Sequence, residues 1–179
     1  MDNVIGVFPS KEAANVAFLN LLKIGYKNQD ISVVIKEDLV LNKDKGQKGG
    51  IASSSLKSGI LSGGLIGGFA GILVGLSAIF VPGIGAVLIA GPLASMLGIG
   101  GAAAVTLSGV VTGVLAGGLA AGLVEIGLEK DAANFYERLV KKGGILVYVP
   151  VNNENSANDI KRIFIENGGN YVKEVEINK

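Results

Sequence analysis

The sequence predicts an α+β fold: a ferredoxin-like (split βαβ) domain interrupted by a glycine-rich, apolar α-helical hairpin. Short β-branched runs alternate with amphipathic helical segments at both ends of the chain. The two ends echo each other, because each has an Ala-Ala-Asn near the start of a helix that leads through glycine into a strand. Residues 58–124 contain no Asp, Glu, Lys or Arg, so all 16 basic and 15 acidic residues lie outside this block.

The first 41 residues read as one βαβ unit. Residues 4–8 form an apolar run that Pro9 ends, and Ser10 can cap the following helix. Residues 11–24 place Ala and Leu on one face at helical spacing, and residues 31–35 are a continuous β-branched run. This half therefore supplies two strands and one helix.

The last part of the chain, 128–179, supplies the remaining elements. The pattern predicts a helix over 129–142, a strand over 145–151, a helix over 156–167 and an alternating strand over 171–177. Neither end has enough strands for a stable sheet of its own. We therefore expect 1–41 and 128–179 to fold together, joined through a polar, flexible linker at 42–57. Two unrelated small α/β pieces remain the alternative.

The central block, 58–127, has the spacing of a glycine zipper. Two segments, 59–80 and 102–124, are each long enough to span about 33 Å as helices, close to the ~30 Å hydrocarbon core of a bilayer. Small residues at every fourth position let two helices approach closely. The predicted helix-packing and oligomerisation residues are Gly59, Gly63, Gly67, Gly71, Gly75, Gly109, Gly113, Gly117 and Ala121. The predicted hairpin turn contains Pro82, Gly83, Gly85, Gly91 and Pro92. Residues 86–97, broken at Gly91-Pro92, are expected to form a short helix that cannot cross the bilayer.

An even number of spans within one domain would leave both termini on the same side of a membrane. Lysines before the first span and basic residues after the second place that side in the cytoplasm by the positive-inside rule. The sequence thus predicts a hairpin in the cytoplasmic membrane. No Trp or Tyr marks an interface, and many positions are Gly, Ala or Ser, so a soluble assembly with hairpins buried between subunits stays open.

Several classes of chemistry have no residues to support them. The net charge is +1 and there is no basic stripe, so nucleic acid is not an expected partner. Cysteine and histidine are both absent, which removes thiol chemistry, the usual general base and the commonest metal ligand. Gly98 to Ala103 matches a dinucleotide fingerprint but lacks the preceding strand and the following acid. We expect no enzyme activity, cofactor, metal or catalytic residue, and no particular small-molecule ligand is indicated.

Short motifs carry a resemblance to known stress proteins. Val4 to Phe8, Glu12-Ala-Ala, Gly25-Tyr26 and Asp30-Ile-Ser-Val-Val resemble the bacterial heat-induced general stress protein family. The central and later motifs are similar to the related glycine-rich stress proteins; these are Val81-Pro-Gly-Ile-Gly, Ala90-Gly-Pro-Leu-Ala, Ala132 to Tyr136 and Lys142-Gly-Gly-Ile-Leu-Val. The resemblance implies a stress-associated protein without an established enzyme activity, and it supplies no catalytic residues.

These observations lead to one main functional hypothesis and two alternatives. The main hypothesis is a non-enzymatic stress protein whose hairpin inserts in the bilayer and drives self-association. The first alternative is a soluble self-assembling structural protein that forms a shell or filament. The second is a regulatory module that binds a ligand or a protein. The chain itself is the expected partner, together with a lipid bilayer under the main hypothesis.

Overall fold

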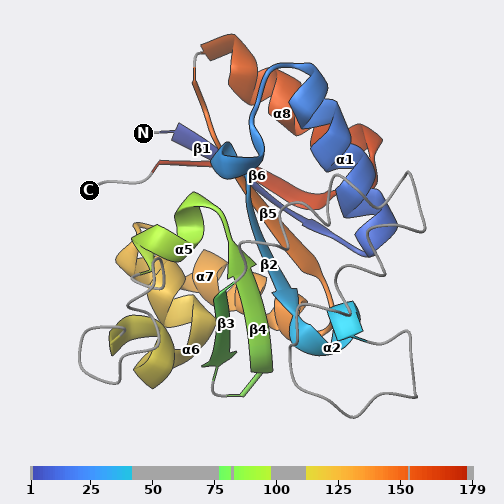
Figure 1. The fold of residues 1–179 in the computed structure, drawn as a ribbon. Helices are drawn as coiled ribbons and strands as arrows, with labels where there is room; N and C mark the ends of the chain where they lie inside the picture. The colour runs from blue at the N-terminus through green and yellow to red at the C-terminus, as the bar shows by residue number, and fades with distance from the viewer. Residues whose placement is uncertain (1, 42–76, 82, 98–111, 153, 177–179) are drawn as a thin grey trace.

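The computed structural model describes residues 2–41, 77–81, 83–97, 112–152 and 154–176 (Figure 1). The strands within these residues are β1 (Asp2–Phe8), β2 (Ser32–Lys36), β3 (Ser77–Val81), β4 (Gly85–Ala90), β5 (Ile145–Pro150) and β6 (Asn170–Glu176). The α-helices are α1 (Lys11–Lys23), α2 (Glu37–Leu41), α5 (Pro92–Met96), α6 (Thr112–Glu125), α7 (Lys130–Lys141) and α8 (Glu154–Glu166). A short 3-10 helix covers Asn28–Asp30.

The described strands form one antiparallel sheet in the order β3-β4-β2-β5-β1-β6. Strand β5, from the end of the chain, lies between β1 and β2 from its beginning. Tyr148 on β5 is in register with Ile5 on β1 and with Ser32 on β2. The two ends of the chain therefore complete a single α+β sheet rather than folding as separate pieces.

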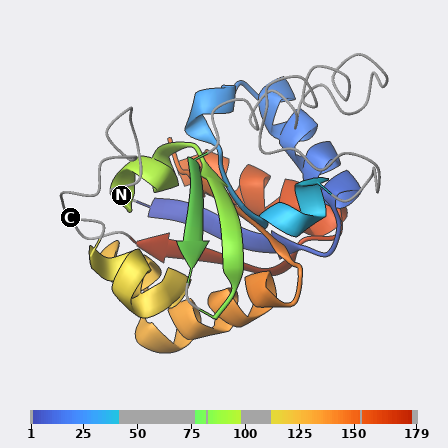
Figure 2. The ribbon, with the colours of Figure 1, turned by 60° about the horizontal axis from the view of Figure 1, so that its bottom comes forward.

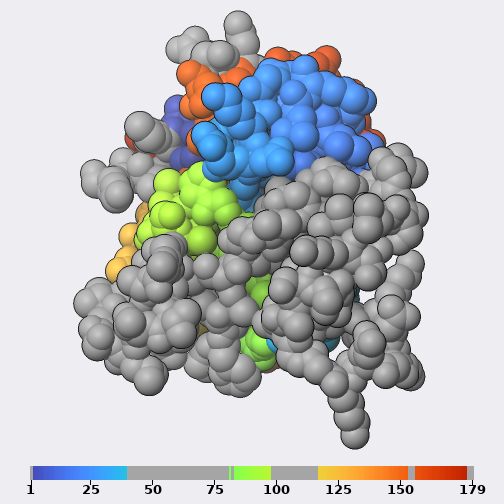
Figure 3. Space-filling view, in the orientation of Figure 1, coloured from blue at the N-terminus to red at the C-terminus, as the bar shows by residue number. Residues whose placement is uncertain are grey.

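Helices cover both faces of the sheet. Helices α1 and α8 lie on one face, and α5, α6 and α7 lie on the other (Figures 1 and 2). Alternate residues of each strand enter the two apolar cores, as the pleat requires. On β5, for example, Val147 packs toward α1 and α8, whereas Tyr148 packs toward α6 and α7. The space-filling view shows the two ends of the chain (blue, and orange to red) packed together (Figure 3).

The predicted elements at the two ends of the chain are confirmed to within about two residues at each boundary. Local sequence signals set these element boundaries. The hydroxyl of Ser10 accepts a hydrogen bond from the Ala13 amide, so it caps α1. Gly25 has φ 101°, which favours glycine, and it stops the same helix. The mixed α+β class and the antiparallel sheet follow from these elements.

The predicted helical hairpin is wrong for residues 77–90. We expected 77–80 to end a long helix and 86–90 to begin a short one. Both segments are strands, and β3 and β4 form an antiparallel β-hairpin that extends the sheet beyond β2. The reason lies in the β-branched and aromatic residues of Ser-Ala-Ile-Phe-Val and Gly-Ala-Val-Leu-Ile-Ala, which suit a pleated surface.

The predicted membrane insertion is also contradicted. Helix α6 has 14 residues, about 21 Å, and non-helical angles at Gly118 (φ 81°, ψ −175°) interrupt it. Among the described residues, no helix combines the length and the apolar character needed to cross a bilayer. The bilayer-inserting hairpin, and with it the location in the cytoplasmic membrane, is therefore a wrong prediction. The positions Gly59, Gly63, Gly67, Gly71, Gly75, Pro82 and Gly109 lie outside the described residues.

Candidate functional site

An aromatic cluster lies at the corner where α7 meets the edge strand β6. The rings of Phe135 and Tyr171 meet edge to face, with centroids 4.5 Å apart and planes at 79°. Phe135 and Tyr136 make a second such contact at 6.0 Å. The guanidinium carbon of Arg138 lies 5.9 Å from the Phe135 ring centroid, within cation–π range. We call Phe135, Tyr136, Arg138 and Tyr171 the aromatic corner.

Tyr171 has an unusual backbone conformation. Among the described residues it is the one non-glycine residue with a positive φ, 54°. The β1–β6 register shifts here, because Ile5 pairs with Lys173 while Val7 pairs with Asn170, so β6 carries an extra residue. A left-handed conformation costs an ordinary residue about 1–3 kcal/mol. Tyr171 is nevertheless 54% exposed, so its own burial does not recover that cost.

The buried Tyr136 side chain holds this conformation. Its hydroxyl donates a 3.0 Å hydrogen bond to the backbone carbonyl of Tyr171. Burial raises the pKa of Tyr136 to about 12, so the hydroxyl stays protonated and able to donate at neutral pH. Just before the bulge, Gly169 lies so close to α8 that a Cβ there would be 2.7 Å from the Phe164 carbonyl oxygen. The strand is thus held at Tyr171 by the Tyr136 hydrogen bond and at Gly169 by its close contact with α8.

Three residues of α7 lie on one face of the helix, next to the aromatic corner. Asp131, Phe135 and Arg138 are spaced i, i+4 and i+7, so they follow one another along the helix. Asp131 and Arg138 are exposed, and Phe135 is partly buried. Within the described residues, neither Asp131 nor Arg138 belongs to a salt bridge. We call these three residues the α7 face; it offers an acid, an aromatic ring and a base in line.

Helix α6 attaches to a different side of α7. The Ala120 amide donates a 2.5 Å hydrogen bond to a carboxylate oxygen of Glu137, just after the break at Gly118. A Cβ at Gly118 would be 2.9 Å from the same oxygen, so glycine is needed for both conformation and space. Because Glu137 is two residues from Phe135, it projects away from the α7 face. Helix α6 therefore leaves that face uncovered.

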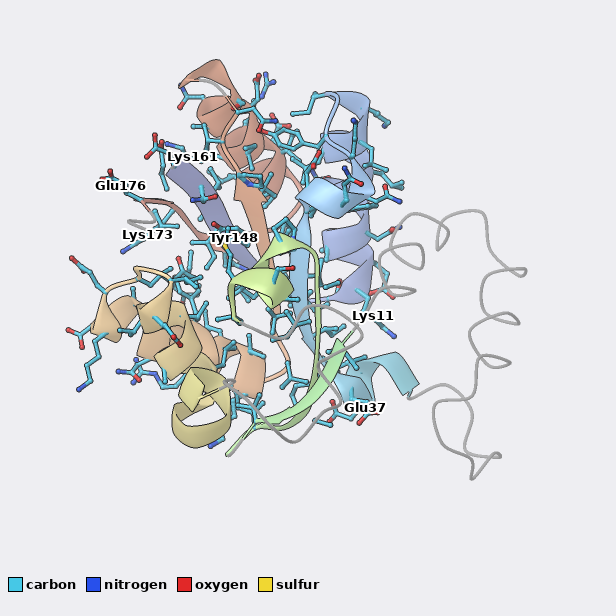
Figure 4. All side chains as sticks on the ribbon, turned by 60° about the vertical axis from the view of Figure 1, so that its left-hand side comes forward. Lys11, Glu37, Tyr148, Lys161, Lys173 and Glu176 are labelled. Atoms are coloured by element: carbon cyan, nitrogen blue, oxygen red, sulfur yellow. The ribbon has the colours of Figure 1, made fainter. Side chains whose placement is uncertain are left out.

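The edge of β6 is protected against pairing with another strand. Its residues Lys173, Glu174 and Glu176 are charged and exposed, and Lys161 on α8 bonds Glu174 at 2.6 Å. Figure 4 shows Lys161, Lys173 and Glu176 gathered on this side of the molecule. Charges and bulges are the usual devices that prevent edge-to-edge strand addition. A partner at this corner must therefore be bound by side chains rather than by the strand backbone.

The remaining sequence-predicted positions are scattered over the fold. Gly113, Gly117 and Ala121 lie on α6, where Gly117 is exposed, Ala121 is partly buried, and Leu119 and Leu123 fill the core. A role of Gly117 and Ala121 in packing against a partner stays a prediction. Among the other predicted positions, Gly83 lies in the β3–β4 turn and Gly85 is the first residue of β4. Gly91 is the N-cap of α5, and Pro92 is its first residue.

Sequence reasoning missed the aromatic corner, although one signal was available. Phe135 lies off the buried stripe of Ala133, Tyr136 and Val140, so an amphipathic helix leaves it at the margin. The exposed bulge at Tyr171 gives no signal of this kind in the sequence. Groups of three or more His, Cys, Asp or Glu that could hold a metal are absent from the described part of the chain.

Comparisons with known proteins add nothing to this geometry. No protein-family model, no curated protein and no solved structure matches the chain.

Proposed function

We propose that this chain is a non-enzymatic α+β domain that self-associates, with two copies pairing across the α7 face of Asp131, Phe135 and Arg138. This develops the self-assembling alternative and sets the membrane hypothesis aside. The surface that pairs lies on α7 and the neighbouring Tyr171 rather than on a glycine hairpin. The partner is a second copy of the same chain.

The order of charge along the α7 face carries the proposal. The acid Asp131 and the base Arg138 stand on either side of Phe135 on the same face of one helix. A two-fold axis near Phe135 sets two copies of α7 antiparallel. Asp131 then faces Arg138 of the partner subunit, and the aromatic rings meet at the centre. A two-fold interface must be complementary to itself, and this face has that property.

The residue types and their rigidity also suit an interface. Tyr, Phe and Arg are enriched at the centres of protein interfaces, where a few such residues supply most of the binding free energy. The Tyr171 ring already packs against Phe135, and the Tyr136 hydroxyl holds the Tyr171 backbone through its carbonyl. Because little conformational freedom is left to lose, association costs less entropy.

Three finer assignments belong to the same proposal. Strands β6, β1, β5 and β2, with α1 and α8, are proposed to be a ferredoxin-like split βαβ unit, which the strand order supports. The absence of His and Cys from the sequence supports a non-enzymatic role. A stress-associated role is proposed from the resemblance of the short motifs alone.

A charge-swap cycle tests the pairing. Sedimentation equilibrium of the full chain would measure the dimer dissociation constant for Asp131→Arg, for Arg138→Asp and for the double swap. Each single swap sets like charges against each other, so we expect at least about tenfold weaker dimerisation, which is 1.4 kcal/mol. The double swap should restore the wild-type constant, because the two charges have only exchanged places.

A matched control separates pairing from general charge effects. Lys23→Asp makes the same charge change as Arg138→Asp at an exposed position in the last turn of α1, which lies on the other face of the sheet. It should leave dimerisation unchanged. A wild-type chain that stays monomeric at every concentration overturns the proposal, because the α7 face then does not pair with a second copy. A double swap that remains as weak as the single swaps also overturns it.

A further inference from the structure

Met96 combines accessibility with an unusual neighbour. It ends the short helix α5 and is 38% exposed. Its sulfur lies 3.9 Å from the hydroxyl of Tyr148, which donates to it. The sequence contains two methionines, Met1 and Met96, and no cysteine or tryptophan. Met96 is therefore the readily oxidised side chain of the described residues.

The Tyr148 hydroxyl lies inside the protein with a weak acceptor. Tyr148 is 0% exposed at the centre of β5, and Figure 4 shows it beside α5. A thioether accepts hydrogen bonds poorly, so this buried donor gains less than it would from an oxygen. Burial raises the pKa of Tyr148 well above its usual value, which keeps the hydroxyl protonated at physiological pH.

The start of α5 is fixed on the sheet, which keeps the sulfur near this hydroxyl. The Leu93 amide donates a 2.9 Å hydrogen bond to the buried hydroxyl of Ser32 on β2. At Gly91, φ is 81° and a Cβ would overlap the Ile31 carbonyl oxygen, so the chain lies directly against the strand. The backbone that carries Met96 is thus held against the sheet beside Tyr148.

We propose that Met96 is an oxidation site for hydroperoxides, and that Tyr148 is the built-in hydrogen-bond donor for the resulting sulfoxide. A sulfur lone pair attacks one oxygen of the hydroperoxide, a sulfur–oxygen bond forms and the oxygen–oxygen bond breaks. With hydrogen peroxide, the proton on the transferred oxygen passes to the departing hydroxide, which leaves as water. The sulfur is oxidised by two electrons and the peroxide is reduced by two.

The separation of the two atoms fits the product. The 3.9 Å between sulfur and hydroxyl is close to the length of a sulfur–oxygen bond followed by a hydrogen bond of about 2.7 Å. A methionine sulfoxide usually disrupts an apolar contact because it is polar. Here its oxygen meets a buried donor whose acceptor, among the described residues, is the thioether. Oxidation should therefore be tolerated and should tie α5 more firmly to β5.

The experiment compares the full wild-type chain with Tyr148→Phe, each treated with hydrogen peroxide. Mass spectrometry of peptides should place one added oxygen on Met96 in both proteins. Oxidation should leave the wild-type melting temperature unchanged or higher. In Tyr148→Phe it should lower the melting temperature by about 2–4 °C, because the sulfoxide oxygen then lacks its donor. Met96→Leu is the control, and its melting temperature should not respond to peroxide.

An infrared measurement gives a second readout that does not depend on stability. A hydrogen bond to the sulfoxide oxygen lowers the S=O stretching frequency, so the band should lie lower in oxidised wild type than in oxidised Tyr148→Phe. Equal frequencies together with equal melting shifts in the two proteins would overturn the proposal. So would a Met96 that resists peroxide while free methionine in the same tube is oxidised.

Discussion

The hydroxyl of Tyr136 donates a 3.0 Å hydrogen bond to the backbone carbonyl of Tyr171, so a buried residue of α7 fixes an exposed, strained residue of β6. This bond connects the interior of the protein to the surface proposed to pair. Changes to either residue therefore separate the stability of the fold from the strength of association.

Replacing Tyr171 by glycine should weaken dimerisation without a matching loss of stability. Glycine adopts a φ of 54° without strain, so the free energy of unfolding should rise or change by less than about 1 kcal/mol despite the lost ring contact. Dimerisation should weaken at least about tenfold, because an interface aromatic is removed. Urea unfolding and sedimentation equilibrium measure the two quantities. A glycine variant that dimerises as tightly as wild type would remove Tyr171 from the interface.

Replacing Tyr136 by phenylalanine tests the bond itself. The ring still fills its buried position, but the Tyr171 carbonyl loses its donor, so we expect a loss of about 0.5–1.5 kcal/mol in unfolding free energy. Dimerisation should weaken as well, since Tyr171 is then less well held. In a Tyr171→Gly background the same substitution should have little further effect on dimerisation. If the two effects on dimerisation simply add, the hydroxyl does not act through Tyr171.

The raised pKa of Tyr136 predicts a loss of stability at alkaline pH. An unfolded tyrosine ionises near pH 10, whereas the folded one does so at about 12, so the folded state retains the proton in between. The unfolded state binds fewer protons in this window, and the free energy of unfolding must fall as pH rises from about 10 to 12. Tyr148, also raised by burial, adds to the fall. Tyr136→Phe should make the decline shallower in urea titrations across this range.

The ends of the chain were predictable because local signals and tertiary structure agree there. The Ser10 cap, the Gly25 stop and the β-branched run at 31–35 each fix one boundary without help from distant residues. The middle was not predictable in the same way. Ser77–Val81 and Gly85–Ala90 are short apolar runs that fit a buried helix or a strand equally well, and only pairing with β2 decides between them.

The aromatic corner was hidden for a different physical reason. Its central feature is an extra residue in β6 that leaves Tyr171 with a positive φ, and Tyr is not a residue whose presence signals that conformation. The spacing of Asp131, Phe135 and Arg138 was readable from the sequence. The role of this face was not readable, because α6 leaves it uncovered only by attaching to another side of α7, through Glu137.

The junction between Gly118 and Glu137 should be the most sensitive point of α6. Gly118→Ala places a Cβ 2.9 Å from the Glu137 carboxylate oxygen and at a φ of 81°, so the free energy of unfolding should fall by about 1–3 kcal/mol. Glu137→Gln keeps an acceptor for the Ala120 amide but removes the negative charge from a helix start. It should cost less, about 0.3–1 kcal/mol.

Urea unfolding measures the free energy of unfolding of Gly118→Ala and Glu137→Gln, and Gly117→Ala serves as the comparison variant. Gly117 is exposed and has a negative φ, but a Cβ there would be 2.5 Å from the Ala121 Cβ, so that neighbour must shift. Alanine also favours the helix, and we expect a smaller loss than at Gly118. If Gly118→Ala is no more destabilising than Gly117→Ala, the break at Gly118 is not held by Glu137. In that case α6 has no fixed position on α7, and the α7 face would not be left free in the way that self-pairing requires.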